Sequence, residues 1–344
     1  MLHGPDPEGP GLPRPKCRRL TGVRVIATGS YVPDAVVSND HLFERFGFDS
    51  DWIVKRTGIL ERRHALPHQA TSDLCLEAIN RCVDRAGINL RDIDLLLVGT
   101  FTPDYSFPST ACIIQDKLKL VCPAVDMQAA CAGFMYALIT GAAYVASGAS
   151  DLCLIVGGDC NSRILNPDDI KTYPLFGDGA GAFLLTRGGK EQGILAYSMG
   201  ADGSGGEQLI RYACGSRQPP TADLIEKGQH YMIMDGRAVF RWAVEILNDT
   251  IQDVLDAVGM TPGDVDLYVP HQANIRIINA ACDTLKIPRQ RVYTNLDRYG
   301  NTSAGSIPLA VDEALADGRL KDGDVTVLSG FGAGLTWGTA VMRW

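Results

Sequence analysis

The sequence predicts a layered α/β fold made of two similar halves. From Val23 onward, short apolar runs alternate with segments of helical length, which is the pattern of proteins that stack helices on sheets. Stretches of the first half also recur, in the same order, in the second half. The chain has 344 residues, 46% of them hydrophobic, and this is enough to bury the core that such a fold needs.

Apolar runs and amphipathic segments give the expected elements in order. Buried strands are expected at 23–28, 93–99, 124–127, 152–157, 181–186, 193–199, 265–269, 291–294, 325–329 and 338–342. Helices are expected at 71–86, 111–119, 132–147, 236–258, 273–285 and 303–317. The segment before the first strand is rich in proline, glycine and basic residues and is expected to be disordered.

The second half repeats the first at a nearly constant spacing. Residues 86–100 parallel residues 258–272, which lie 172 positions later. The same spacing places Cys131 opposite Ser303, each at the start of an Ala/Gly-rich helix. Chance similarity between generic αβ units is the alternative explanation. We expect a tail at 1–21, an N-terminal half with the nucleophilic cysteine at 22–190, and a C-terminal half with histidine and asparagine at 191–344.

Charge and cysteine usage exclude several classes of protein. The 32 basic and 40 acidic residues give a net charge of −8, which argues against nonspecific nucleic-acid binding. The ten cysteines contain no CxxC pair, so neither a zinc ribbon nor a thioredoxin motif is supported, and no metal site is expected. Scattered reduced thiols favour a cytoplasmic location. The charge-free segment 127–150 is interpreted as a buried helix, not a membrane span.

Cys131 is the first candidate for chemistry. It lies in VDMQAACAGF, where a strand passes through a short turn into a helix. The N–H groups and dipole of a helix N-terminus stabilise a thiolate, so we expect a lowered pKa and a nucleophilic sulfur. The same backbone amides can hold an oxyanion. A structural cysteine remains the alternative.

Two polar motifs in the second half strengthen the case for Cys131. His271 ends a strand in VPHQANIR, and Asn301 precedes the helix that pairs with the Cys131 helix. A nucleophilic cysteine with a distant histidine and asparagine suits acyl transfer from a thioester. The sequence has no GxxxxGK[ST], and no GxGxxG follows a strand, so nucleotide binding lacks its usual evidence.

Five motifs together resemble a known family. CAGF, FGDGAGA, VPHQANIRII, GNTSAGSIPLA and GFGAGLTWG occur in the order found in β-ketoacyl-acyl-carrier-protein synthase III of the thiolase superfamily. The resemblance covers about residues 22–344. It implies a duplicated αβαβα five-layer sandwich, an active homodimer, and chemistry without a metal or redox cofactor. Elongating ketosynthases are less similar, because they use a second histidine where this chain has Asn301.

The resemblance implies a reaction in two half-reactions. Cys131 takes an acyl group from an acyl-CoA primer, and the amides of Cys131 and Ala333 receive the oxyanion. Malonyl-acyl-carrier protein then binds, and His271 and Asn301 donate hydrogen bonds to its thioester carbonyl. The enolate left by decarboxylation attacks the acyl-cysteine, and the resulting 3-oxoacyl-carrier protein begins a fatty acid or a related acyl chain.

The resemblance also assigns residues around the site. Phe331 is expected to favour loss of the carboxylate, and Phe107 to reach into the partner's pocket. Trp52 and Arg56 match contacts to the adenine and phosphate of coenzyme A, and Arg276 matches a basic residue at the mouth of the tunnel. The sequence departs from the family at Ile170, where relatives carry an arginine that stacks on adenine.

The sequence leaves two other functions open. A Cys-His-Asn acyltransferase of the same fold would move an acyl group to an alcohol or amine without forming a C–C bond. A thioester-binding protein would hold the same ligand with Cys131 as a structural residue. Release of carbon dioxide from malonyl-carrier protein separates the condensing enzyme from both.

Overall fold

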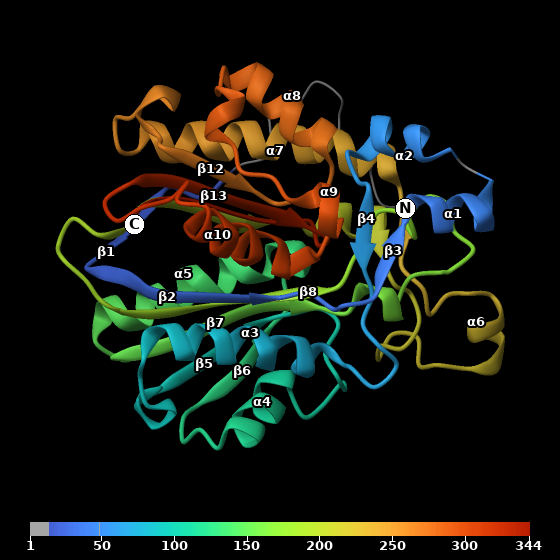
Figure 1. Cartoon of the computed structure of the whole chain (residues 1–344), viewed down its shortest axis with the longest axis horizontal. Helices are drawn as coiled ribbons and strands as arrows, with labels where there is room; N and C mark the ends of the chain where they lie inside the picture. The colour runs from blue at the N-terminus through green and yellow to red at the C-terminus, as the bar shows by residue number, and fades with distance from the viewer. Residues whose placement is uncertain (1–13, 48) are drawn as a thin grey trace.

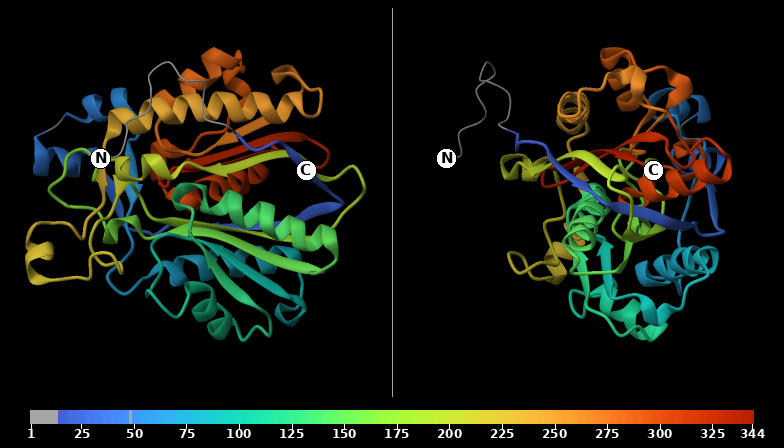
Figure 2. Two further views of the ribbon diagram at one scale, coloured as in Figure 1. Left: turned by 180° about the vertical axis from the view of Figure 1, so that it is seen from behind. Right: turned by 90° about the vertical axis from the view of Figure 1, so that its left-hand side faces the viewer.

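The chain builds two five-stranded sheets with helices between them and on both outer faces (Figure 1). The computed structural model describes residues 14–47 and 49–344. Helices α3 and α4 cover the outer face of the first sheet, and helices α7 and α8 cover the outer face of the second. Helices α5 and α10 lie between the sheets, as the view from behind also shows (Figure 2). This is the predicted five-layer sandwich.

The first sheet has the strand order β2-β8-β7-β5-β6. Strands β5, β6 and β7 run parallel, and β8 joins β7 and β2 in antiparallel pairs. Its elements are β2 (Val23–Tyr31), α3 (Thr71–Ala86), β5 (Leu95–Gly99), α4 (Thr110–Leu118), β6 (Ala124–Met127), α5 (Gly133–Ser147), β7 (Leu152–Asp159) and β8 (Gly179–Arg187).

The second sheet has the order β1-β9-β14-β13-β12. Its elements are β1 (Arg18–Thr21), β9 (Gly193–Ala201), α7 (Gly236–Asp256), β12 (Leu267–Pro270), α8 (Ile275–Leu285), α10 (Ser306–Ala316), β13 (Val325–Gly332) and β14 (Thr336–Arg343). Strand β13 lies in the sheet as β7 does, between a parallel and an antiparallel neighbour. The repeat in the sequence is therefore a repeat of structure.

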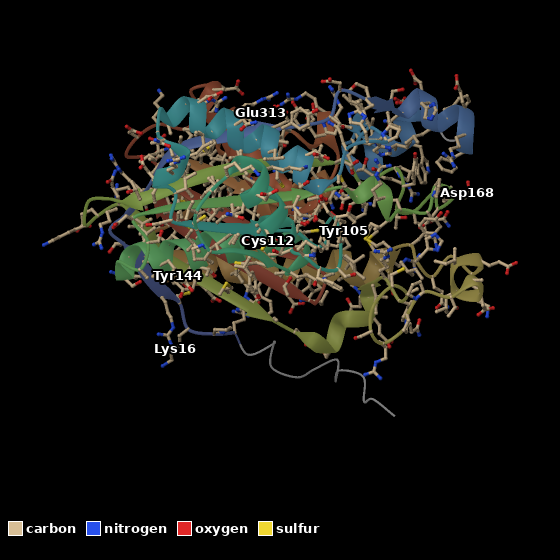
Figure 3. All side chains as sticks on the ribbon, turned by 90° about the horizontal axis from the view of Figure 1, so that it is seen from below. Lys16, Tyr105, Cys112, Tyr144, Asp168 and Glu313 are labelled. Atoms are coloured by element: carbon tan, nitrogen blue, oxygen red, sulfur yellow. The ribbon has the colours of Figure 1, made fainter. Side chains whose placement is uncertain are left out.

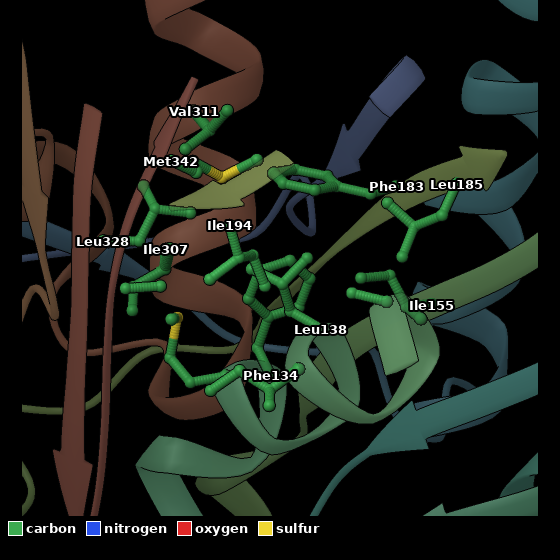
Figure 4. Close-up of a cluster of buried hydrophobic side chains, with 14 of the residues drawn as sticks. Phe134, Leu138, Ile155, Phe183, Leu185, Ile194, Ile307, Val311, Leu328 and Met342 are labelled. Atoms are coloured by element: carbon green, nitrogen blue, oxygen red, sulfur yellow. The ribbon is translucent and has the colours of Figure 1, made fainter. Parts of the chain in front are cut away.

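Helix α5 is apolar on all sides because both sheets pack against it. Phe134 and Leu138 lie in one buried cluster with Ile155 and Phe183 of the first sheet and Leu328 of the second (Figure 4). Among the described residues, only the segment Ala130–Ser147 is long and apolar enough to cross a membrane, and 67% of it is buried inside the protein. This agrees with its interpretation as a core helix.

The N-terminal boundary differs from the expectation. Residues 1–13 of the expected tail lie outside the described residues, but residues 14–21 are ordered. Strand β1 pairs antiparallel with β9, so this segment adds an edge strand to the sheet of the C-terminal half. Arg14 also binds Asp249 at 2.6 Å and Asp253 at 2.7 Å on α7. The proline and basic residues of this segment are typical of disorder. Its strand partner β9 and its acidic partners on α7 lie far along the chain, so the local sequence does not reveal them.

One predicted strand is absent, and several short elements were not predicted. Val292 forms only an isolated bridge with Tyr268, so 291–294 is not a strand. Most of the unpredicted elements that are labelled in Figure 1 lie toward one end of the molecule. They are β3 (Val36–Ser38), α1 (Asn39–Phe46), α2 (Ser50–Thr57), β4 (Glu61–Arg63), β10 (Leu209–Ile210), α6 (Ala222–Glu226), β11 (Ile233–Met234) and α9 (Leu296–Tyr299).

Candidate active site

Cys131 lies in a one-turn 3-10 helix, Ala130–Ala132, that leads into α5. The residue is 6% exposed. The backbone of Gly332, at the end of β13, passes so close that a Cβ there would lie 2.6 Å from the Cys131 nitrogen. A glycine is therefore required at this position, and the sulfur is held by elements of both halves.

Ser303 of the C-terminal half meets the sulfur. Its hydroxyl donates a hydrogen bond to Cys131 Sγ at 3.3 Å. Ser303 begins a second one-turn 3-10 helix, Ser303–Gly305, which leads into α10 as the Cys131 turn leads into α5. The two residues that the sequence repeat pairs are therefore in contact in the structure. Asp159 anchors the second turn by accepting a bond from the Ala304 N–H at 3.1 Å.

Burial, not the helix terminus, controls the pKa of Cys131. Burial raises that pKa to about 12, although the Ser303 hydrogen bond acts in the opposite direction. The expected lowering was wrong. A helix dipole supplies about 0.3–1 kcal/mol, and a pKa change of one corresponds to about 1.4 kcal/mol, so the dipole cannot offset full desolvation. The resting group is a thiol.

His271 directly follows β12 and is 1% exposed. Its Nδ1 shares a hydrogen bond of 2.6 Å with the hydroxyl of Ser306, at the start of α10. The ring of Phe331 meets it edge to face at 5.2 Å between centroids. Burial lowers the pKa of His271 to about 3, so the imidazole is neutral at physiological pH.

Asn301 is fixed through both its backbone and its side chain. Its N–H donates to the Leu175 carbonyl at 2.8 Å, and its own carbonyl accepts from the Gly177 N–H at 3.0 Å. Its side-chain oxygen accepts from the Ser303 N–H at 2.8 Å. This bond fixes the orientation of the amide, and its NH2 group is the donor that a ligand can use.

One cavity of about 1150 Å³ brings the predicted groups together. Cys131, His271, Asn301 and Phe331 all line it. The lining also includes Trp52, Arg56, Ile170, Lys171, Arg237, Arg241 and Arg276. The mouth is therefore rich in cationic side chains, whereas Cys131, His271, Asn301 and Phe331 are buried.

Two predicted residues do not line this cavity within the described chain. Ala333 lies between Gly332 and Leu335, which do line it, and the Ala333 carbonyl accepts a bond from the Thr336 hydroxyl at 2.9 Å. Phe107 is 86% exposed, on the outside of the molecule. Its predicted role requires a second copy of the chain.

Cation–π contacts organise the mouth of the cavity. The Arg56 guanidinium lies 4.4 Å from the centre of the Trp52 ring, and Arg276 lies 5.5 Å from the Phe240 ring. Ile170 is 41% exposed. The aromatic surface at the mouth is thus already in contact with arginines of the chain itself.

Three residues support the site although the sequence assigns no role to them. Ser303 was found as the repeat partner of Cys131, but its contact with the sulfur was not anticipated. Ser306 is part of the GNTSAGSIPLA motif, although no local signal shows that it binds His271. Asp159 gave no signal at all, because its partners Thr100, Phe101, Thr102 and Ala304 are distant in the sequence.

Known proteins resemble this chain in both sequence and structure. The family profile "3-Oxoacyl-[acyl-carrier-protein (ACP)] synthase III" matches residues 125–203, and its C-terminal counterpart matches residues 255–344. A β-ketoacyl-[acyl-carrier-protein] synthase III of Rhodopirellula baltica is 51% identical over 94% of this chain and 99% of its own length. The chain belongs to this family. A second member, from Desulfitobacterium hafniense, is 45% identical over 94% of this chain and 98% of its own.

Solved structures agree with the family membership. The synthase III of Thermus thermophilus has a TM-score of 0.86 and 40% identity over 93% of this chain and 98% of its own. The priming β-ketosynthase of the R1128 polyketide pathway has a TM-score of 0.85 and 33% identity, over 97% and 98%. The predicted family, fold and acyltransferase class are confirmed. Membership also supports the condensing reaction over acyl transfer to an alcohol or amine.

Proposed function

We propose that the cavity performs a decarboxylative condensation in which the two halves of the chain divide the work. An acyl thioester primer and malonyl-acyl-carrier protein combine to give 3-oxoacyl-carrier protein and carbon dioxide. The product begins a fatty acid chain. The single observation that carries these roles is the convergence of a buried thiol, a neutral imidazole and a fixed amide on one cavity.

In the first half-reaction the primer moves to Cys131. Since burial keeps this group a thiol, its proton must leave as the sulfur attacks the thioester carbonyl. His271 takes that proton and passes it to the departing thiolate of the carrier, so the net change is an exchange of thioesters. The amides of Cys131 and Ala333 receive the transient oxyanion.

In the second half-reaction His271 and Asn301 act as hydrogen-bond donors. They bind the thioester carbonyl of malonyl-carrier protein and stabilise the enolate that remains when carbon dioxide leaves. The enolate carbon attacks the acyl-cysteine carbonyl, and the Cys131 thiolate departs and regains a proton. Phe331, packed edge to face against His271, presents an apolar surface that disfavours the ionised carboxylate.

The Ser306 hydroxyl lets one imidazole serve both half-reactions. When Ser306 accepts from Nδ1–H, Nε2 is free to accept the thiol proton; when Ser306 donates to Nδ1, Nε2–H is a donor for the malonyl carbonyl. The hydroxyl rotates to match either tautomer, and the ring passes from one to the other by losing the Nδ1 proton to water and gaining one at Nε2. No step requires a metal or redox cofactor, because acyl transfer and decarboxylation of a malonyl thioester involve no net oxidation.

The cationic mouth is proposed to receive both carriers. Arg56 and Trp52 bind the phosphates and adenine of acyl-CoA, and Arg276 meets acyl-carrier protein, whose surface is acidic. Arg237 and Arg241 extend the same charged rim. With Ile170 in place of an arginine, adenine lacks a second stacking partner, and stacking of this kind contributes about 0.5–2 kcal/mol.

The active form is proposed to be a homodimer built on the β6 edge. Strand β6 is the last strand of its sheet, and an unpaired edge is a template for a second copy. Tyr105, Cys112 and Tyr144 lie on the face that contains this edge (Figure 3), and Phe107 and Val121 are 86% and 85% exposed. Sedimentation should show a dimer, and Val121→Glu should shift it toward the monomer. A wild-type monomer at micromolar concentration would reject this assembly.

The function is tested by intact mass and by gas release. The enzyme is incubated with acetyl-, isobutyryl- and octanoyl-CoA, and one acyl group should add to the wild type and none to Cys131→Ala. The acylated enzyme should then release carbon dioxide from malonyl-acyl-carrier protein and form a C–C bond. Loading that survives in Cys131→Ala would show that another residue is the nucleophile. We place the reaction in the cytoplasm, consistent with ten free thiols.

A further inference from the structure

Arg62, on β4, is the largest of the fully buried side chains in the described part of the chain. Its guanidinium donates to the Val37 carbonyl at 3.0 Å, to Asn39 Oδ1 at 2.9 Å and to the Pro174 carbonyl at 2.7 Å. All three acceptors are neutral. Burial lowers the pKa of Arg62 to about 10, so the side chain keeps its charge at physiological pH. A buried cation that bonds to neutral oxygens is costly and invites a functional explanation.

The acceptor at Pro174 belongs to a segment that runs beside the backbone around Asn301. These two segments come together directly over Arg62. A Cβ added at Gly177 would lie 2.2 Å from the Tyr299 carbonyl, and one added at Gly177 or at Gly300 would lie 3.2 Å from Arg62 Cβ. Only glycines permit this approach, and Gly300 also has a φ of +64°. Figure 1 shows β4 beside α9, which leads into this junction.

The Asn301 backbone is hydrogen-bonded to the same segment whose Pro174 carbonyl binds Arg62. The Leu175 carbonyl, one residue after the Arg62 acceptor, binds the Asn301 N–H at 2.8 Å, and the Gly177 N–H binds the Asn301 carbonyl at 3.0 Å. The neighbouring β4 residue Arg63 accepts a further bond from the Asp178 N–H at 2.8 Å. The position of the Asn301 amide therefore depends on where residues 174–178 lie.

We propose that Arg62 is a positioning residue for Asn301. It fixes the backbone of residues 174–177, and this backbone fixes Asn301 where its amide donor reaches the malonyl thioester carbonyl. The inference rests on the proposed role of Asn301. Without the guanidinium, the Pro174 carbonyl loses a charge-assisted bond and the segment shifts. A mutation far from the reacting atoms that misplaces a group by about 1 Å can slow the reaction about a hundredfold. Cys131 is held by other elements, so its acylation does not depend on Arg62.

The test is a double-mutant cycle between Arg62→Met and Asn301→Ala. Two rates are measured: acylation of Cys131 by acetyl-CoA, and carbon dioxide release from malonyl-acyl-carrier protein. Arg62→Met should slow gas release by about ten- to a hundredfold and acylation by less than about threefold. In the Asn301→Ala background, Arg62→Met should cost almost nothing further, because the donor that it positions is gone.

Two further variants separate positioning from folding. Arg62→Lys keeps the charge but reaches fewer acceptors, so its gas-release rate should lie between those of the wild type and Arg62→Met; it also serves if Arg62→Met does not fold. Arg291→Met is the matched control, because Arg291 donates to the carbonyls of Gly263 and Val265 at a position away from the cavity. It should lower the melting temperature and leave both rates nearly unchanged.

Four results would overturn the inference. Gas release by Arg62→Met within about twofold of the wild type would show that the amide needs no support from Arg62. Equal losses in both rates would indicate general damage to the fold. Fully multiplicative losses in the double variant, with Asn301→Ala itself impaired, would show that Arg62 acts independently of Asn301. If Asn301→Ala releases carbon dioxide normally, the proposed function of Asn301 fails first, and the role of Arg62 fails with it.

Discussion

The two halves of the chain carry the same turn, but only one of them carries sulfur. The Ala130–Ala132 turn precedes α5, and the Ser303–Gly305 turn precedes α10. Each turn contains a non-glycine residue in the left-handed region, Ala130 with φ +45° and Ser303 with φ +53°. The first copy supplies the Cys131 thiol, and the second copy supplies the hydroxyl that donates a hydrogen bond to its sulfur. The repeat thus places a thiol and its hydrogen-bond donor at matching positions of the two halves.

Strands β5 and β12, which occupy corresponding places in the two halves, also differ at their ends. After β5, Thr100, Phe101 and Thr102 all direct hydrogen bonds to the buried carboxyl of Asp159. After β12, in the other half, His271 lines the cavity instead. The polar groups after β5 therefore bond to a buried carboxyl, whereas His271 after β12 faces the cavity. Under the proposed mechanism the second half carries decarboxylation, and its His271 also serves acylation of the first-half thiol.

Removal of the Asn301 donor tests this division most strongly. An oxyanion-type donor is worth about 3–4 kcal/mol of barrier, so Asn301→Ala should slow carbon dioxide release about a hundred- to a thousandfold. Acylation of Cys131 by acetyl-CoA should stay close to the wild-type rate. Intact mass and gas release measure the two steps separately. A variant that loses acylation while it decarboxylates normally would reverse the roles of the halves.

Alkylation tests the state of the thiol. With a pKa of about 12, roughly one part in ten thousand of Cys131 is thiolate at pH 8, so iodoacetamide should modify the exposed Cys112 and Cys214 first. Between pH 7 and pH 9, the rate at Cys131 should rise about a hundredfold, since the thiolate fraction rises tenfold per pH unit. Peptide mapping gives the order of modification. Preferential labelling of Cys131 below neutral pH would mean that the helix terminus outweighs burial.

Deletion of the Ser303 hydroxyl should give the smallest effect. Ser303→Ala keeps the backbone N–H that binds Asn301 and removes the hydroxyl that donates to the sulfur. A hydrogen bond to a developing charge is worth about 1.5 kcal/mol, which predicts about tenfold slower acylation with decarboxylation unchanged. Thr250→Val, which removes a buried hydroxyl elsewhere in the core, is the control. Equal effects of both variants on acylation would remove Ser303 from the site.

Periodicity and motifs predicted the frame of the molecule and the reacting residues. The helix Thr71–Ala86 has the predicted bounds because its apolar pattern is determined by one buried face, and the strand Ala124–Met127 also has the predicted bounds. Cys131, His271 and Asn301 were found by their places at strand and helix ends, and they share one cavity. Their roles in the reaction stay predictions.

Properties that depend on distant segments could not be predicted. The pKa of Cys131 is controlled by desolvation, which arises only when the backbone around Gly332 closes over the turn. Likewise, RTGILERRH contains Arg56, Arg62 and Arg63, and nothing local shows that the second is fully buried while the first stacks on Trp52. Strand β1 escaped notice because its partner β9 lies about 175 residues later, in the other half.

The most direct measurement is carbon dioxide release from malonyl-acyl-carrier protein by Cys131→Ala. If His271 and Asn301 perform decarboxylation without the nucleophile, this variant should release carbon dioxide at a rate similar to that of the wild type. It should take up no acyl group and form no C–C bond. Gas release that falls to the level of Asn301→Ala would contradict the division of labour between the two halves.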